Sequence, residues 1–146
     1  MAVDPARSAR MALIKGRDTK PELRVRKALH AHGLRFRLHD RRLPGAPDIV
    51  FPSRRLALFV HGCFWHQHPC CSRARMPKSR QDFWGPKLTG NVARDARKFA
   101  ELEAMGWAVM VIWECETERA GHLVALADEI GRIPQRKRAR PTSYTQ

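Results

Sequence analysis

Cysteine and histidine residues gather in one short segment in the middle of the sequence. Cys63, His68 and Cys70 are soft or borderline metal ligands at the short spacing of a loop, and Cys115 offers a further donor from a distant segment. A closed shell of four ligands, three Cys and one His, is the arrangement that structural zinc favours. The alternative is a group of buried free thiols. Cys71 is an ambiguity, because the adjacent residues Cys70 and Cys71 do not easily both reach one ion.

Two further histidines of this segment, His61 and His66, are left over when His68 binds zinc. A free imidazole, with an unperturbed pKa of about 6.5, suits a general base that activates water. Such a base needs a carboxylate to orient it, and Asp95 is the candidate. The alternative is that both histidines are ordinary surface residues.

Asp48 opens an expected strand over 48–51, and a buried strand is expected to follow over 56–60. Adjacent strand ends hold a divalent ion between a carboxylate and an oxygen of the neighbouring strand. Mg²⁺ needs few protein ligands there, because water and phosphate oxygens complete its shell. The alternative is an acid that only stabilises a turn.

These residues must be positioned by 146 residues, of which 43% are hydrophobic, enough for one packed domain. We expect a basic arm over 1–18, a folded domain over 19–133 and a basic disordered tail over 134–146. Thr19 and Glu22 predict a capping box at the start of the first helix. Helices are expected over 19–32, 91–105 and 118–131, and strands over 34–38, 48–51, 56–60 and 107–113. Residues 72–90 are expected to be irregular. The order α-β-β-β-α-β-α predicts a small α/β fold, in which 107–113 is a central strand because it is apolar on both faces.

The charge of the chain points to a polyanionic partner. Its 28 Lys and Arg residues outnumber 14 Asp and Glu residues, which gives a formal net charge of +14. Nucleic acid is the expected partner, because each neutralised phosphate releases condensed counterions. The longest apolar run, 107–113, is far shorter than the roughly 20 residues of a membrane span, so we expect a cytoplasmic protein without a membrane partner. Phe64, Trp65 and Trp84 lie in basic segments, where they either cover the core or stack on bases.

Several motifs occur in the order and at the spacing of one known family. They lie at 17–23, 43–49, 61–70, 83–84, 91–95 and 106–115. Together they resemble the very-short-patch-repair (Vsr) endonucleases over about residues 7–116. The resemblance implies a restriction-endonuclease-like core, with a mixed central sheet flanked by helices and a structural zinc site. It also implies an enzyme that nicks one DNA strand 5′ of the thymine in T:G mismatches, which arise when 5-methylcytosine deaminates.

The resemblance also assigns roles to single residues. Asp48 corresponds to the Mg²⁺-binding aspartate, His66 to the catalytic histidine and Asp95 to the acid that supports it. Glu22 and His61 match further active-site positions. The implied zinc ligands are Cys63, His68, Cys70 and Cys115. The implied DNA contacts are Met11, Phe64, Trp65 and Trp84. Some family members have Thr where this chain has Val60, so we expect only the backbone carbonyl of Val60 to reach Mg²⁺.

Two other functions compete with the mismatch endonuclease. A non-catalytic, zinc-stabilised DNA-binding module has no use for Asp48 or Asp95, because carboxylates that face phosphates weaken binding. A hydrolytic zinc enzyme needs an open metal position, which Cys115 closes. The nuclease is expected to act as a cytoplasmic, nucleoid-associated monomer on double-stranded DNA, with mismatch-repair proteins as candidate partners.

Overall fold

The computed structural model describes residues 18–136. The expected arm up to residue 17, which includes Met11, and the tail from residue 137 lie outside them. In chain order, the helices and strands are α2 (Lys20–Ala31), β1 (Arg37–Leu38), β2 (Ile49–Phe51), β3 (Leu56–His61), α3 (Gln81–Ala104), β4 (Ala108–Trp113) and α4 (Ala120–Gly131). This order confirms the predicted α-β-β-β-α-β-α arrangement.

The strands form one mixed sheet in the order β1-β2-β3-β4. Strand β2 pairs antiparallel with β1 and β3, whereas β3 and β4 are parallel, with His61 opposite Trp113 at their carboxyl ends. The prediction of a central strand over 107–113 is therefore wrong, because β4 lies at the edge of the described sheet. Its apolar residues are explained by the helices that cover both of its faces.

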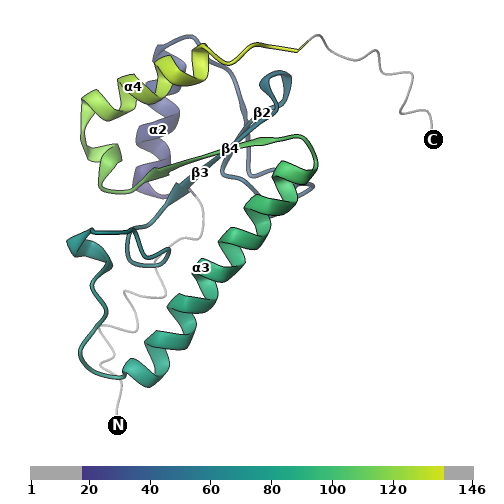
Figure 1. Cartoon of the computed structure of the whole chain (residues 1–146). Coiled ribbons are helices and arrows are strands. Elements are labelled where there is room, and N and C mark those ends of the chain that lie inside the picture. Colours follow the sequence, from purple (N-terminus) through teal and green to yellow (C-terminus); the bar gives the residue numbers. More distant parts are fainter. Residues whose placement is uncertain (1–17, 137–146) are drawn as a thin grey trace.

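Helices cover the sheet on both sides (Figure 1). On one side, α2 and α4 pack on the sheet through a core that includes Leu29, Leu58 and Ile130. On the other side, Leu102 of α3 packs against Phe59 of β3. The fold is thus a mixed α/β sheet flanked by helices, as predicted.

Helix α2 begins where the capping signal predicts. The N–H of Glu22 donates to Oγ1 of Thr19 (3.4 Å), and the carboxylate of Glu22 accepts from the N–H of Asp18 (2.5 Å) rather than from that of Thr19. Gly33 follows the helix with φ of 79°, a conformation that glycine adopts without steric cost. The cap also fixes the side chain of Glu22, which is only 2% exposed.

Helix α3 begins ten residues before the expected start at Asn91, so the prediction of an irregular 72–90 segment is wrong over its second half. Pro86 lies in the second turn and removes one backbone donor, but buried Leu88 (1% exposed) anchors this part of the helix. At about 1.5 Å per residue its 24 residues span about 36 Å. The six residues of β3 span only about 20 Å. The amino-terminal part of α3 therefore projects beyond the sheet (Figure 1).

No helix within residues 18–136 has both the length and the apolar character needed to cross a bilayer.

Candidate active site and metal cluster

A cleft of about 1100 Å³ opens between the carboxyl end of β3, the start of α2 and the middle of α3. It brings together every described residue for which the sequence predicted a catalytic or Mg²⁺-binding role. These residues are Glu22, Asp48, Val60, His61, His66 and Asp95. Their convergence from separate segments is the first sign that the cleft is a functional site.

Asp48 lies at the start of β2, where the turn before it approaches α3. Gly45 in this turn has φ of 77°, and a Cβ there would lie 3.2 Å from Cβ of Lys98, so the turn requires glycine. The N–H of Val60 donates to Oδ2 of Asp48 (2.8 Å). Burial raises the pKa of the Asp48 carboxyl to about 7, and the nearby Glu22 carboxyl adds to the rise. Two carboxyl groups held together in this way form a place that favours a cation.

His66 forms the second polar centre of the cleft. Its Nδ1 lies 2.6 Å from Oδ2 of Asp95, which projects from α3. Its ring stacks on that of His61, with centroids 3.7 Å apart and planes 8° from parallel. Burial lowers the pKa of the His61 imidazole to about 3, and the neighbouring His66 contributes to that shift. His61 is thus neutral at ordinary pH, and the imidazole that Asp95 orients belongs to His66.

The three predicted aromatic residues meet at one end of the cleft. Phe64 and Trp65 line it, and Trp84 of α3 packs against both, with ring centroids 5.4 Å from Phe64 and 5.9 Å from Trp65. All three are partly exposed. The amide of Asn91 donates to the carbonyl of Trp65 (3.0 Å) and ties the loop to the helix. The cluster is therefore a shared surface of loop and helix rather than part of the core.

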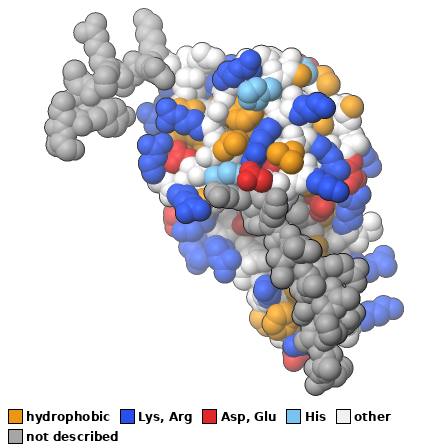
Figure 2. Space-filling view, turned by 180° about the vertical axis from the view of Figure 1, so that it is seen from behind, with side chains coloured by type: hydrophobic (Ala, Val, Ile, Leu, Met, Phe, Trp, Pro, Cys, Tyr) orange, Lys and Arg blue, Asp and Glu red, His pale blue; other side chains and the backbone are white. Residues whose placement is uncertain are grey.

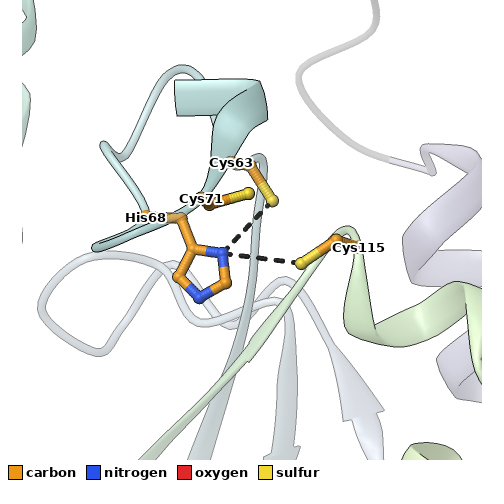
Figure 3. Close-up of side chains that lie close together, drawn as sticks. All are labelled: Cys63, His68, Cys71 and Cys115. Atoms are coloured by element: carbon orange, nitrogen blue, oxygen red, sulfur yellow. Dashed lines mark hydrogen bonds between the residues drawn. The ribbon is translucent and has the colours of Figure 1, made fainter. Parts of the chain in front are cut away.

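Four side chains converge next to this cleft, on the far side of the loop that follows β3. They are Cys63, His68, Cys71 and Cys115, whose potential ligand atoms all lie within 4.8 Å of one another. Nδ1 of His68 lies 3.6 Å from Sγ of Cys63 and 3.5 Å from Sγ of Cys115 (Figure 3). Tetrahedral zinc with ordinary bond lengths separates its sulfur and nitrogen ligands by about 3.5 Å. The cluster therefore fits zinc.

The structure differs from the predicted ligand set at one position, because it brings Cys71 and not Cys70 beside the other three side chains. Cys71 points into the cluster (Figure 3). Cys70 is exposed and is not part of it. Cys70 has φ of 57°, in the left-handed region, and Cys71 is extended, with φ of −110°. This change of backbone conformation turns the second of the two adjacent side chains inward. The sequence identified the choice between neighbours but not its outcome.

Several polar residues of the site were not predicted. Glu114 lines the cleft and accepts from the N–H of Cys63 (3.3 Å), and it directly precedes Cys115 in the sequence. Nη2 of Arg26 donates to the carboxylates of Asp18 (2.7 Å) and Glu22 (3.3 Å). Nε2 of His39 lies 3.0 Å from the same nitrogen of Arg26. The i, i+4 spacing of Glu22 and Arg26 is the one signal that was available for this network.

Basic side chains surround the site. Arg41 lines the cleft near the start of α2, and Arg94 and Lys98 line it along α3. Figure 2 shows further Lys and Arg side chains spread over the face of the molecule opposite to that of Figure 1. The surface therefore agrees with the polyanionic partner that the net charge predicts.

Comparison with known proteins gives one consistent family. The family described as "DNA mismatch endonuclease Vsr" matches residues 2–72. The type II nicking enzyme V.XorIIP of Xanthomonas oryzae pv. oryzae is 56% identical over 115 residues, which cover 79% of this chain and 84% of that protein. The type II nicking enzyme V.NmeAIP of Neisseria meningitidis is 46% identical over 75% of this chain and 78% of its own length. The DNA mismatch endonuclease Vsr of Escherichia coli is 44% identical over 75% of this chain and 69% of its own length.

Proposed function

The chain belongs to the Vsr family of DNA mismatch endonucleases and is a DNA nicking endonuclease, and from this premise we propose that it nicks one strand 5′ of the thymine in a T:G mismatch. The single observation that carries the proposal is the cleft, which an oriented imidazole, a pair of carboxyl groups and partly exposed aromatic rings line together. A DNA-binding module has no need for the carboxyl pair, which repels phosphate.

His66 acts as the general base in this proposal. In this role the Nδ1–H of His66 donates a hydrogen bond to Oδ2 of Asp95, so Nε2 is the nitrogen that takes a proton from the attacking water. The stacked His61 ring limits rotation of the imidazole. Both constraints exist without DNA, so the orientation of the base costs no reorganisation when the substrate binds.

Asp48 and the backbone carbonyl of Val60 are the proposed Mg²⁺ ligands. The residues fit this ion, because the cleft holds two carboxyl groups together and leaves most coordination positions to water and phosphate. Mg²⁺ bound there supplies positive charge that stabilises the phosphate oxygens during cleavage. Asp48 keeps Oδ2 oriented through the Val60 N–H, and Glu22 adds negative charge that strengthens cation binding.

The cluster of Cys63, His68, Cys71 and Cys115 is the proposed structural zinc site. Four protein ligands would fill a tetrahedral shell, so a zinc ion held there would have no open position for water. It would join the loop after β3 to the segment after β4. The fold is compatible with the restriction-endonuclease-like core that the family resemblance implies, because Asp48 directly precedes β2 and Val60 lies on the adjacent strand β3.

The aromatic cluster is the proposed reader of the mismatch. Phe64, Trp65 and Trp84 present partly exposed rings at the end of the cleft that holds His66. Separating a base step costs a few kcal/mol and costs least at a mismatch, so inserted rings favour T:G over a matched pair. Arg41, Arg94 and Lys98 would contact phosphates on either side.

Met11, outside the described residues, is proposed as a further inserted side chain. We also propose a monomer that acts on chromosomal DNA in the cytoplasm, with mismatch-repair proteins as candidate partners.

The proposal is tested with duplexes that differ at a single pair. The zinc-loaded protein is incubated with Mg²⁺ and with DNA that carries T:G, T:A or C:G at one site in a methylation context. We expect nicking of the T:G duplex alone, on the strand that carries the thymine and directly 5′ of it. Equal nicking of T:A and T:G would refute mismatch recognition, and nicking of the guanine strand would refute the assigned orientation.

A further inference from the structure

Trp113 lies between the metal cluster and the active site. On one side its ring stacks on His68, with centroids 4.2 Å apart and planes 9° from parallel. On the other side it meets His61 edge to face, with centroids 5.3 Å apart and planes at 72°. His61 in turn stacks on His66. A continuous series of rings thus joins a candidate zinc ligand to the proposed general base.

The backbone fixes the two middle members of this series. His61 and Trp113 are paired residues at the ends of the parallel strands β3 and β4. The N–H of Glu114 donates to the carbonyl of His61 (2.8 Å), and the N–H of Trp113 donates to Oε1 of Glu116 (2.9 Å). The backbone of Trp113 is therefore held rigidly, and the contacts of its ring determine where the imidazoles of His68 and His61 lie.

The His61 ring lies between Trp113 and His66 and contacts both rings. It is buried, 4% exposed, and its ring is surrounded by Phe59, Phe99 and Trp113. No hydrogen bond to the His61 ring is found in the described structure, so ring packing alone holds its plane. His66 has one polar tether, Asp95, and a single hydrogen bond does not fix the tilt of an imidazole. The stack on His61 supplies that second constraint.

We propose that Trp113 is a positioning residue, which holds His66 in its reactive orientation by filling the space between His68 and His61. This inference rests on the proposed function, in which His66 is the general base. Loss of the Trp113 ring lets His61 tilt into the space, and His66 follows. A misplacement of about 1 Å at a reacting group costs a rate factor of about 100.

The test compares two variants of Trp113 with one of Trp107, all as zinc-loaded protein. Trp113→Met removes the aromatic plate, and Trp113→Phe keeps a smaller one. Trp107→Met is the matched control. Trp107 directly precedes β4 at its amino end and packs under Arg55, whereas Trp113 lies at the carboxyl end beside His61 and His68. Three quantities are measured: the zinc content, the affinity for the T:G duplex without Mg²⁺ and the single-turnover nicking rate with Mg²⁺.

We expect Trp113→Met to nick ~10–100-fold more slowly with unchanged zinc content and unchanged duplex affinity. Trp113→Phe should recover most of the rate, and Trp107→Met should nick like the wild type. The imidazole proton resonances of His61 and His66, recorded without DNA, should shift in Trp113→Met and much less in Trp113→Phe.

A wild-type rate in Trp113→Met would overturn the proposal, and so would unshifted His66 resonances. Loss of zinc in proportion to the loss of rate would also overturn it, because Trp113 would then serve only the metal cluster. Should Trp113→Met fail to fold, the test uses Trp113→Phe alone. The positioning role would be refuted if this protein had normal zinc content and unshifted histidine resonances but nicked as slowly as an inactive enzyme. A wild-type protein that nicks no T:G duplex would refute the proposed function instead, while the resonance shifts would still test the ring contacts.

Discussion

Replacing Asp48 with Asn should raise the free energy of unfolding of the Mg²⁺-free protein at alkaline pH. Burial and the adjacent Glu22 carboxyl raise the pKa of Asp48 from 3.8 to about 7 in the folded protein. Between these values the folded state binds a proton that the unfolded state has released, so the wild type loses stability as the pH rises from about 4 to about 7. Above pH 7 the loss is complete and constant. Below pH 4 it is absent.

The size of this effect follows from the pKa shift. A shift of about three units corresponds to a ceiling of about 4 kcal/mol, at about 1.36 kcal/mol per unit. Water penetration and relaxation of the cleft reduce this, and we expect a gain of ~1–3 kcal/mol for Asp48→Asn at pH 8. The Asn side chain keeps an oxygen that accepts from the Val60 N–H and adds an amide that donates to Glu22. The gain should therefore come from the lost charge and not from new packing.

Urea unfolding at pH 5 and pH 8, with zinc present and Mg²⁺ absent, measures this difference. The advantage of Asp48→Asn should be smaller at pH 5, where part of the wild-type penalty is not yet present. Asp40→Asn is the control, because Arg42 holds the pKa of Asp40 below its usual range, so this variant should gain nothing at pH 8. Added Mg²⁺ should stabilise the wild type and not Asp48→Asn. A variant that is no more stable than the wild type at pH 8, or equally favoured at both pH values, refutes the reasoning.

The other predictions concern the metal cluster, the general base and the aromatic surface. Cys71→Ser should lower the zinc content measured by elemental analysis, whereas Cys70→Ser should leave it unchanged; the reverse result would return Cys70 to the ligand set. His66→Ala should reduce the single-turnover nicking rate by roughly 10²–10⁴-fold with little change in duplex affinity, and an equal loss of affinity would make His66 a phosphate contact. Trp65→Ala should weaken T:G binding more than binding to a matched duplex in an electrophoretic assay; equal losses would indicate that Trp65 only supports the fold.

The sequence predicted those elements whose boundaries depend on a few adjacent residues. Thr19 caps α2, and Gly33 closes it, because capping depends on a few adjacent residues. The buried strands β2 and β3 were predicted from short apolar runs, and Asp48 was correctly placed at a strand start. The helix signal failed at the start of α3, where interruption by proline suggested an irregular segment. Burial of Leu88 outweighs the cost of a proline in the second turn, and burial is a tertiary effect.

Features that depend on packing were not available from the sequence. An apolar strand reads the same at a sheet edge as at its centre when helices cover both faces, so the position of β4 was predicted wrongly. The choice between Cys70 and Cys71 depends on one left-handed residue that no local motif marks. The hydrogen bond from Asn91 to Trp65 joins residues that lie far apart in sequence, and only the folded chain places them together.

In the proposed function, the loop after β3 couples recognition of the mismatch to cleavage of the strand. Trp65 and His66 are adjacent, and both lie between Cys63 and His68, two members of the metal cluster. A nuclease that lost its reading residues but kept its chemistry would cut the chromosome without selection. With the roles proposed for Trp65 and His66, one loosened loop would displace both at once, so thiol oxidation or loss of the zinc would silence the enzyme before making it promiscuous. For a protein that handles its own genome, this order of failure is the safe one.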